Sequence, residues 1–514
     1  MIVMSAIVAA YGPFDETLGQ RMLDRIQHRG PDGRGVKRVG AAWIGSHHLA
    51  VMDPGATPPP LAAPDAGLWL VGDGVIYNHR RIRAALDGTA FMTGSDLEAA
   101  LRLFARDGVA AFARLWGTFA LAVAGEAGEF AVARDVLGIA PLYWARRGDT
   151  TLFASEMKAF DEDWREFVEP FPPGHAWTPS GGLVADPAAI STAPVLLQSR
   201  AADEEPPAWV FDAVRETLIR AVEETLDASK PVGILLSGGV DSSIIAAIAA
   251  RLAAKRGLTL PSFSVGLAGS RDLAAAKLVA EHVGTTHHEL TYTAEEAVDL
   301  LPTIIGELES FDPKLVHSAV PHHLVAALAA EQVTVVLAGE GADELYAGYS
   351  HFGRHTDGAA LHGELLDTLD GMHAGGLQRV DRVAGAHGLE PRLPFLDLDV
   401  VELAMALPPE WKLISEQRPA KWLLRRAFDG WLPDEVLWRR KEQFGEGTGM
   451  NDVLGEHFSA VPKADEATPD ELRAAAPELD PPLRTAEELA YYRIFSDALP
   501  GINAQRTVGR FVEA

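Results

Sequence analysis

The sequence contains no cysteine among its 514 residues. Disulfide bonds, thiolate zinc sites and cysteine nucleophiles are therefore excluded. Its 48 Gly and 33 Pro residues are too dilute for a fibrous or low-complexity chain. Hydrophobic residues at 47% and charged residues at 23% match soluble globular averages, so we expect the chain to fold, and its length predicts two domains.

Positive charge is scarce relative to negative charge. Lys and Arg number 45 against 72 Asp and Glu, which gives a net charge of −27. A chain this acidic repels polyanions at long range, so we expect neither a nucleic-acid partner nor binding to an anionic membrane. No stretch approaches the roughly 20 apolar residues that span a bilayer. The apolar residues 1–10 lack a basic leader and are typical of a buried strand, so we expect a cytoplasmic protein.

Apolar runs in the first part of the chain are short and alternate with Gly, Asp and Pro turns up to residue 190 or so. This pattern predicts stacked sheets, with helices at 15–28 and 96–107. A polar, turn-rich segment at 195–208 predicts a linker. The expected domains are therefore residues 1–195 and 205–514.

Beyond the linker, compact apolar runs alternate with longer helical stretches. Strands alternating with helices predict a parallel, doubly wound sheet, which makes the fold class α/β. After residue 360 or so the chain is expected to be mainly helical. The helices are expected at 208–228, 242–256, 271–283 and 319–331, and the strands at 232–236, 262–265 and 333–337.

The string Ser237-Gly-Gly-Val-Asp-Ser-Ser243 lies between an apolar run and a helix. Such a loop presents backbone N–H groups and the positive end of a helix to an anion, and its serine hydroxyls add donors. An ordinary strand-to-helix turn would need only the two glycines, so the whole string favours phosphate binding. The expected binding residues are Ser237, Gly238, Gly239, Ser242 and Ser243, with Asp241 as a hard oxygen ligand for Mg²⁺.

Two common nucleotide motifs are missing. No Gly-x-x-x-x-Gly-Lys-Ser/Thr string supports γ-phosphoryl transfer, and no Gly-x-Gly-x-x-Gly string follows the strand to bind a dinucleotide. A second strand ending in glycines and carboxylates, 335–349, is expected at the carboxyl edge of the sheet, where ligands of such folds bind. Its carboxylates Glu340, Asp343 and Glu344 would also serve as helix caps.

The glycine-rich loop resembles that of the ATP pyrophosphatases, and the motifs together resemble the asparagine synthetase family. The C-terminal motifs stand in the family's order: Phe263–Leu267, Glu390–Asp397 and Arg440–Gly449. The N-terminal part is similar to the family's glutaminase domain through His28–Asp32, Ile76–His79, Thr93–Asp96, Arg134–Tyr143 and Ala154–Lys158. The resemblance also includes β-lactam synthetases and lasso-peptide cyclases, relatives that keep the ATP chemistry but use a different amine as the nucleophile.

The resemblance implies an N-terminal αββα sandwich of the N-terminal-nucleophile hydrolase type and a C-terminal ATP-pyrophosphatase domain. It implies ATP and Mg²⁺ as cofactors, with a carboxylate activated as an acyl-adenylate. Glu340 is implied as base or orienter, Lys441 as the stabiliser of developing negative charge, and Asp241 and Asp343 as metal ligands. Further implied nucleotide contacts are Leu235, Val265, Ala338 and Gly339 around adenine and Lys421 near the phosphates, although a solvated helix lysine would also fit position 421.

The N-terminal part departs from the family at its catalytic positions. Ser5 stands in place of the nucleophilic cysteine, and a hydroxyl is a far weaker nucleophile at neutral pH. His48 replaces the arginine that holds glutamine, and Asp73 replaces an asparagine where a carboxylate would repel a developing oxyanion. Asp96, the family's contact for the glutamine amino group, is retained. We expect a degenerate site without glutaminase activity, unless processing makes Ser5 the first residue.

The acid-binding side has changed as well. The segment 311–318 stands where the family has Thr-Thr-Ile-Arg, so a carboxylate clamp is lost. His317 and Asp343 are the candidate contacts to the acid, and aspartate is not the expected substrate. Glu340 matches asparagine synthetases rather than β-lactam synthetases, which carry tyrosine there, so lactam closure by their dyad is not favoured.

These observations predict an AMP-forming amide ligase of specialised metabolism, such as antibiotic biosynthesis. Its partners would be a small carboxylate and an amine or ammonia. Two alternatives stay open: an asparagine synthetase that uses free ammonia, and a catalytically silent scaffold. The intact Asp241, Glu340, Asp343 and Lys441 argue against the scaffold. A homodimer is also an open option.

Overall fold

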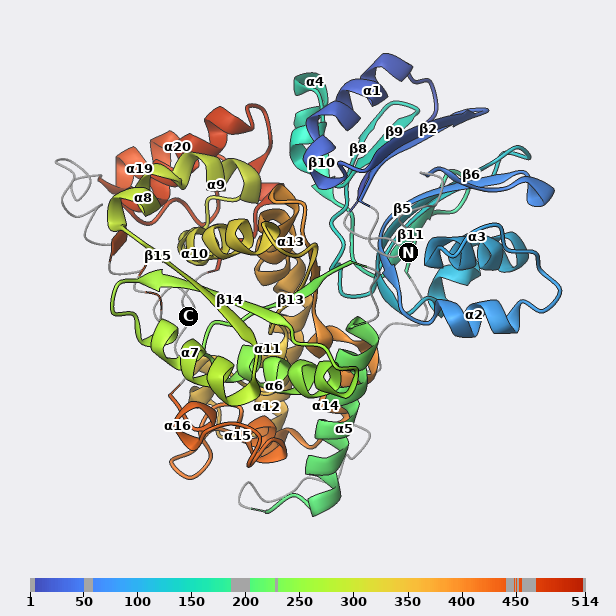
Figure 1. Ribbon diagram of the computed structural model, residues 1–514. Coiled ribbons are helices and arrows are strands. Elements are labelled where there is room, and N and C mark those ends of the chain that lie inside the picture. The colour runs from blue at the N-terminus through green and yellow to red at the C-terminus, as the bar shows by residue number, and fades with distance from the viewer. Residues whose placement is uncertain are drawn as a thin grey trace.

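Three β-sheets form the framework of the protein (Figure 1). The structure is a computed structural model, and it describes residues 5–49, 59–185, 204–226, 230–440, 448, 450, 453–454 and 468–511. The two sheets of the N-terminal part are antiparallel, and the sheet of the C-terminal part is parallel. The expected linker at 195–208 lies mostly outside the described residues.

The N-terminal part contains two six-stranded sheets, in the orders β10-β8-β9-β1-β3-β2 and β12-β11-β7-β6-β5-β4. The first sheet comprises β1 (Ala6–Tyr11), β2 (Gly33–Val39), β3 (Ala42–His48), β8 (Tyr143–Arg147), β9 (Thr150–Ala154) and β10 (Val168–Pro170). The second comprises β4 (Leu61–Ala63), β5 (Leu68–Ile76), β6 (Gly117–Gly125), β7 (Phe130–Arg134), β11 (His175–Thr178) and β12 (Gly182–Ala185).

Helices cover the outer faces of these two sheets. Helix α1 (Glu16–Arg25) packs on the first sheet, and α2 (His79–Ala85) and α3 (Asp96–Asp107) lie on the side of the second (Figure 1). Central strands such as β1 are thus buried on both faces, which explains their continuous apolar sequence. Between the sheets lies a core rich in aromatic rings: Phe130, Trp144, Phe153, Phe171 and Trp177. The αββα sandwich is confirmed.

The C-terminal part is built on a five-stranded parallel sheet with the order β15-β14-β13-β16-β17. Helices α6 and α7 pack on one face, and α10 and α13 pack on the other, so the sheet is doubly wound as predicted. The strands are β13 (Val232–Leu235), β14 (Pro261–Leu267), β15 (Thr286–Tyr292), β16 (Val335–Leu337) and β17 (Glu390–Arg392).

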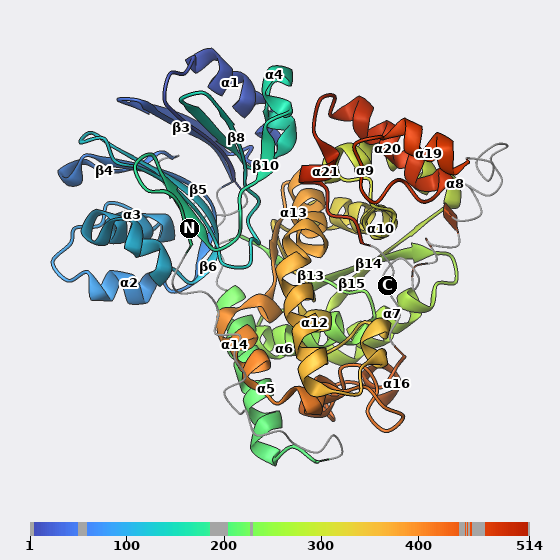
Figure 2. The same cartoon turned by 180° about the vertical axis from the view of Figure 1, so that it is seen from behind.

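The helices of the C-terminal part surround this sheet. Those up to β17 are α5 (Ala208–Thr225), α6 (Val240–Lys255), α7 (Arg271–Val283), α8 (Ala294–Asp299), α9 (Leu301–Leu308), α10 (Pro313–Ala330), α11 (Ala342–Leu345), α12 (Gly358–Gly371) and α13 (Gly376–Ala386). Those that follow are α14 (Leu398–Ala406), α15 (Trp422–Ala427), α16 (Asp434–Leu437), α19 (Pro469–Ala475), α20 (Ala486–Ala498) and α21 (Ala504–Thr507). Helix α20 packs on α9, and α21 reaches β10 of the N-terminal part (Figure 2).

The strand order reverses direction at β13. The chain passes from β13 to β14 on one side and later returns to β16 on the other, so the loops after β13 and β16 lie side by side. Such a switch point leaves a crevice at the carboxyl edge of the sheet. The fold therefore brings together the two loops that the sequence marks for nucleotide binding.

Two predicted helices match the structure at both ends, α3 at 96–107 and α7 at 271–283. Helix α10 begins six residues before the predicted 319. Its start is set by Asp312, whose Oδ1 accepts from the N–H of Leu315 at 3.2 Å, and by Pro313 in the first turn. Strand β17 interrupts the region that was expected to be mainly helical.

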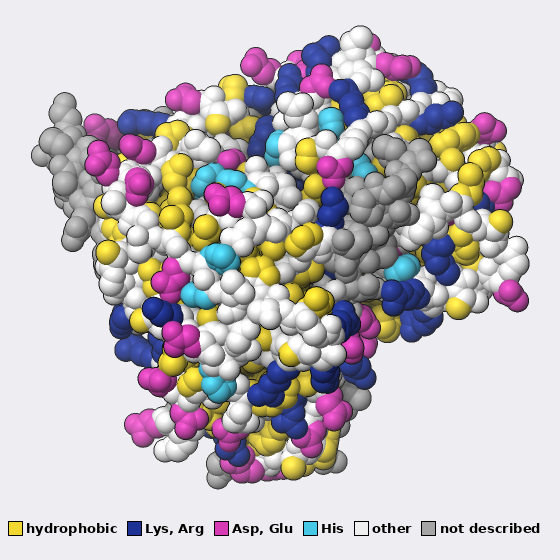
Figure 3. All heavy atoms as spheres, in the orientation of Figure 1, with side chains coloured by type: hydrophobic (Ala, Val, Ile, Leu, Met, Phe, Trp, Pro, Cys, Tyr) yellow, Lys and Arg dark blue, Asp and Glu magenta, His cyan; other side chains and the backbone are white. Residues whose placement is uncertain are grey.

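Acidic and basic side chains are interspersed on the molecular face shown in Figure 3. Among the described residues, no helix is both long enough and apolar enough to span a bilayer.

Candidate active site

The loop after β13 turns tightly into α6. Gly238 has a φ of +78°, and a Cβ there would lie 2.6 Å from a backbone carbonyl oxygen of α7, so only glycine fits. The hydroxyls of Ser237 and Ser242 lie 3.0 Å apart, and Ser243 Oγ donates to the carbonyl of Gly239 at 2.7 Å. These bonds fix the loop at the N-terminus of α6, where the helix dipole favours an anion.

The loop after β16 lies against the first loop. A Cβ on Gly339 would lie 2.8 Å from the backbone nitrogen of Ser242. The chain then enters α11, which carries Asp343 and Glu344. Burial and the adjacent Asp343 carboxylate raise the pKa of Glu344 to about 7, and Tyr349 Oη donates to this carboxyl group at 2.6 Å. Glycine is needed at position 339 because the backbones of the two loops touch there.

One ammonium group lies between the carboxylates of the two loops. Lys421 Nζ is 2.5 Å from Asp241 Oδ2 and 2.7 Å from Asp343 Oδ1, and the lysine side chain is 0% exposed. Gly348 makes room for this pair, because a Cβ there would lie 1.9 Å from Asp343 Oδ1. Two carboxylates that converge on one cation are also the hard oxygen donors that Mg²⁺ prefers. The residues present therefore fit the implied metal.

Glu340 is held by an arginine that lies outside every sequence motif. Arg379 Nη2, on α13, donates to Glu340 Oε1 at 2.8 Å, and both side chains are largely buried. The Glu340 carboxylate is therefore oriented by a fixed cation. Burial, followed by the charge of the same Arg379, also lowers the pKa of His322 well below its ordinary value.

Asp241, Glu340, Asp343 and Arg379 line a cavity of about 1320 Å³. Pockets for one drug-sized ligand measure roughly 300–1,000 Å³, so this cavity has room for a nucleotide and a second substrate. The predicted residues in its lining are Leu235, Ser237, Gly239, Asp241, Ser242, Val265, His317, Ala338, Gly339, Glu340 and Asp343. Gly238, Ser243 and Lys421 lie outside this lining, and Lys441 lies outside the described residues.

His317 is fixed to the C-terminal helices at the wall of the cavity. Its Nε2 lies 2.5 Å from Glu487 Oε1 on α20, and Tyr491 Oη donates to the same oxygen at 2.8 Å. Burial opposes ionisation of Glu487, but the contacts with His317 and Tyr491 hold its pKa below the ordinary value. An imidazole tied to a carboxylate does not provide the two-pronged clamp of a guanidinium.

In the N-terminal part, Ser5 and Asp73 are in direct contact. Ser5 is fully buried, its Oγ has no hydrogen-bond partner among the described residues, and its nitrogen donates to Asp73 Oδ1 at 2.7 Å. The atom that would act as the base of an N-terminal nucleophile is thus engaged as a donor. Burial raises the pKa of Asp73 to about 7, against the opposing charge of Arg29.

His48 and Asp96 are buried separately from that pair. Burial lowers the pKa of His48 to about 4, so this imidazole is neutral at pH 7 and cannot attract a substrate carboxylate. Asp96 Oδ2 accepts the N–H of Ile76 at 2.6 Å, and burial raises its pKa to about 6. Among the described residues, no hydrogen bond links either side chain to Ser5 or Asp73.

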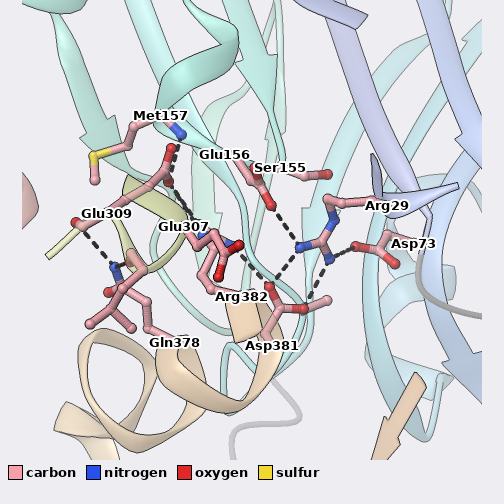
Figure 4. Close-up of polar contacts among 12 residues, drawn as sticks. Arg29, Asp73, Ser155, Glu156, Met157, Glu307, Glu309, Gln378, Asp381 and Arg382 are labelled. Atoms are coloured by element: carbon pink, nitrogen blue, oxygen red, sulfur yellow. Dashed lines mark hydrogen bonds and ion pairs between the residues drawn. The ribbon is translucent and has the colours of Figure 1, made fainter. Parts of the chain in front are cut away.

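Asp73 also belongs to a buried ionic cluster, named here the Arg29 cluster (Figure 4). Arg29 Nη2 is 2.9 Å from Asp73 Oδ2, on the N-terminal side, and 2.9 Å from Asp381 Oδ1, on α13. A small cavity of about 40 Å³ lies beside Asp73 and Asp381. The cluster comprises Arg29, Asp73, Glu156, Glu309, Asp381 and Arg382.

Comparisons with known proteins agree with both parts of this geometry. A family model described as asparagine synthase matches residues 213–363 and 354–476, and one described as a glutamine amidotransferase domain matches residues 4–169. The chain belongs to the asparagine synthetase family. It is an ATP-dependent carbon–nitrogen ligase of that family.

Two curated relatives share about a third of the sequence over nearly the whole chain. Asparagine synthetase [glutamine-hydrolyzing] of Sandersonia aurantiaca is 35% identical, covering 98% of this chain and 97% of the relative. Asparagine synthetase [glutamine-hydrolyzing] 2 of Oryza sativa subsp. japonica is 34% identical, covering 98% and 87%. A solved glutamine phosphoribosylpyrophosphate amidotransferase from B. subtilis is 18% identical with a TM-score of 0.33, covering 56% of this chain and 81% of that one.

Sequence reasoning missed the partners that hold the predicted residues. Arg379 and Asp381 stand in no motif, and Asp381 is 352 positions from Arg29. Arg29 lies within the His28–Asp32 motif, but nothing in that motif names its partners. Such pairs are set by the docking of α13, which no local pattern encodes.

We predict that Asp241→Asn weakens binding of the magnesium–ATP complex by about tenfold or more, equivalent to 1.4 kcal/mol. The substitution removes one of the two carboxylates that share Lys421 while keeping the shape of the side chain. Calorimetric titration of wild type and variant measures the change. The control is Asp212→Asn, which removes an exposed carboxylate paired with Arg215 on α5. Equal affinity of wild type and Asp241→Asn would contradict the assigned site.

We predict that the free energy of unfolding of Asp73→Asn, measured relative to that of wild type, increases as pH rises from 5 to 8. With a pKa of about 7 in the folded protein and 3.8 as the ordinary value, Asp73 binds a proton on folding within this window. Stability from this group therefore falls as pH rises, and asparagine removes that loss. Thermal unfolding at several pH values measures it.

The matched control is Asp161→Asn. Although burial opposes it, Arg21 and Arg25 lower the pKa of Asp161, so its titration lies below this window and its difference in melting temperature should stay constant. A pH-independent difference for Asp73→Asn as well would show that Asp73 is ionised throughout.

Proposed function

We propose that the protein is an AMP-forming amide ligase that activates a small carboxylate as its adenylate and couples it to an amine or to free ammonia. We propose further that it lacks glutaminase activity and serves specialised metabolism. The observation that carries the ligase chemistry is the placement of Lys421 between Asp241 and Asp343, beside the serine–glycine loop. This arrangement suits ATP that binds together with Mg²⁺, because the ammonium can contact phosphate oxygens and the carboxylates can contact the metal.

In the first step, an oxygen of the substrate carboxylate attacks the α-phosphorus of ATP. The new O–P bond forms as the bond between that phosphorus and the bridging oxygen breaks, and pyrophosphate leaves with the electron pair. The N-terminus of α6 and the hydroxyls of the loop 237–243 bind the departing pyrophosphate. Mg²⁺, held by Asp241 and Asp343, would neutralise its charge when bound.

In the second step, the amine nitrogen attacks the acyl carbonyl carbon and AMP leaves with the C–O bonding electrons. Glu340, oriented by Arg379, accepts the proton that the amine loses or aligns the amine for attack. By its family position, Lys441 stabilises the negative charge that develops on the carbonyl oxygen. An amide, AMP and a proton result.

Several side chains support the loss of glutaminase activity. Ser5 supplies a hydroxyl that is fully buried, and its nitrogen donates to Asp73. His48 is neutral at pH 7, and Asp73, which the resemblance places at the oxyanion position, offers an acceptor oxygen that is bonded to the Ser5 nitrogen. An amine that enters from solvent is the alternative source of nitrogen.

A second candidate is an asparagine synthetase that uses free ammonia. The presence of Glu340 and the names of the two curated relatives favour asparagine as the product, while those names specify glutamine as the relatives' source of nitrogen. It differs from the first candidate in requiring aspartate as the acid.

The test is pyrophosphate release, screened over a panel of small carboxylates with ammonium, glutamine or a small primary amine as the nitrogen source. We expect at least one acid to release pyrophosphate with ammonium or an amine, and glutamine to give no turnover above background. At ATP concentrations well below saturation, Asp241→Asn should lower the rate of release by about tenfold or more. Mass spectrometry of the product identifies the amide and AMP.

Each outcome separates the candidates. Asparagine formation from aspartate and ammonium establishes the second one. Turnover with glutamine at the rate seen with ammonium refutes the loss of glutaminase activity. No acid-dependent release of pyrophosphate from any acid, with any nitrogen source, refutes the ligase assignment.

A further inference from the structure

Helix α13 is tied to the N-terminal part through the guanidinium of Arg29, whose ion pairs with Asp73, Glu156 and Asp381 are drawn in Figure 4. Arg29 Nε donates to the carbonyl of Ser5 at 3.0 Å, and Nη1 donates to Glu156 at 3.1 Å and to Asp381 at 2.8 Å. Nη2 donates to Asp73 and Asp381, each at 2.9 Å. Arg29 is 0% exposed, so water does not compete for these bonds.

A second set of contacts fixes the same helix. Arg382 Nη2 lies 3.3 Å from Glu309 Oε2, and the Glu309 carboxylate accepts the backbone N–H groups of Met157 and Lys158 at 2.9 and 2.7 Å. Gln378 Nε2 donates to the carbonyl of Leu308 at 2.8 Å. One face of α13 is therefore bonded to both parts of the chain.

The other face of α13 carries Arg379, which binds the candidate catalytic residue Glu340. Residues 379 and 381 point about 200° apart around the helix, since each residue advances about 100°. Asp381 thus faces the Arg29 cluster, whereas Arg379 faces the large cavity and binds Glu340. The cavity beside Asp381 and the nucleotide cavity share no lining residue among those described, so α13 forms the wall between them.

We propose that Arg29 and Asp381 are positioning residues for the ligase reaction. They hold α13 so that Arg379 presents Glu340 to the activated acid, and the relic of the glutaminase site thereby supports the second active site. This inference rests on the proposed ligase function.

Charge burial explains why the position of α13 is so closely determined. A buried guanidinium or carboxylate that loses its partner is left desolvated without compensation, which costs far more than an exposed ion pair is worth. The helix can therefore shift only if several buried pairs break together. A displacement of about 1 Å at a catalytic group can lower a rate a hundredfold.

The test compares Asp381→Asn with wild type, using the acid and amine found in the pyrophosphate screen. We expect kcat to fall by about tenfold or more while KM for ATP stays unchanged, because the loop 237–243 does not belong to α13. Assays run well below the measured melting temperature of each variant, so that all proteins stay folded. The control is Asp161→Asn, which removes a carboxylate shared by Arg21 and Arg25 inside the N-terminal part and should leave both constants unchanged.

A double-mutant cycle separates positioning from general stability. If Asp381 acts through Arg379 and Glu340, Asp381→Asn should have little further effect on kcat in an Arg379→Gln background. Independent, multiplying losses would overturn the proposal, as would an unchanged kcat in Asp381→Asn. If Asp381→Asn does not fold, Arg29→Lys, which keeps a cation within the cluster, takes its place with the same expectations.

Failure of the inference is distinguishable from failure of the proposed function. Wild-type turnover that does not respond to Asp381→Asn or Arg29→Lys overturns only the positioning role. Wild type that releases no pyrophosphate with any acid overturns both.

Discussion

Two carboxylates, each in the first turn of the helix that follows a neighbouring strand, must be held together at the edge of one sheet, and this constraint governs the C-terminal part. Asp241 and Asp343 repel each other unless a cation lies between them, and Lys421 supplies it at 2.5 and 2.7 Å. The glycines of both loops allow this approach, since side chains at positions 238, 339 and 348 would clash with neighbouring atoms. The switch in strand order at β13 supplies the crevice that the pair occupies.

The N-terminal part retains the sandwich of its family, but its central polar groups are engaged with one another. Asp73 contacts Arg29 and the nitrogen of Ser5 instead of leaving a site open for a substrate oxygen. Through Asp381 the same arginine links the sandwich to α13. The two parts of the chain are thus joined by buried charge, an interaction that tolerates little displacement because each ion depends on its neighbours.

Much of the fold and of the nucleotide loops could be predicted because the signals are local. The run 232–243 encodes strand, turn and helix in consecutive residues, and carboxyl ends of adjacent parallel strands must meet at one edge. Lys421 could be placed only as one of two options, since its burial depends on Gly348 and on α15. Arg379 and Asp381 could not be found, because their partners lie in other elements and no spacing rule joins them. The early start of α10 was missed because Pro313 was not recognised as a first-turn residue.

The contact between Ser5 and Asp73 has an evolutionary consequence. A thiol introduced at position 5 by a single codon change would still face an aspartate at position 73, bonded to Arg29, and an uncharged imidazole at position 48. A change at position 73 would in turn affect the boundary between the sandwich and α13, because Arg29 pairs with both Asp73 and Asp381. Substitutions at positions 5 and 73 therefore have unequal costs, since only the second alters a buried charge.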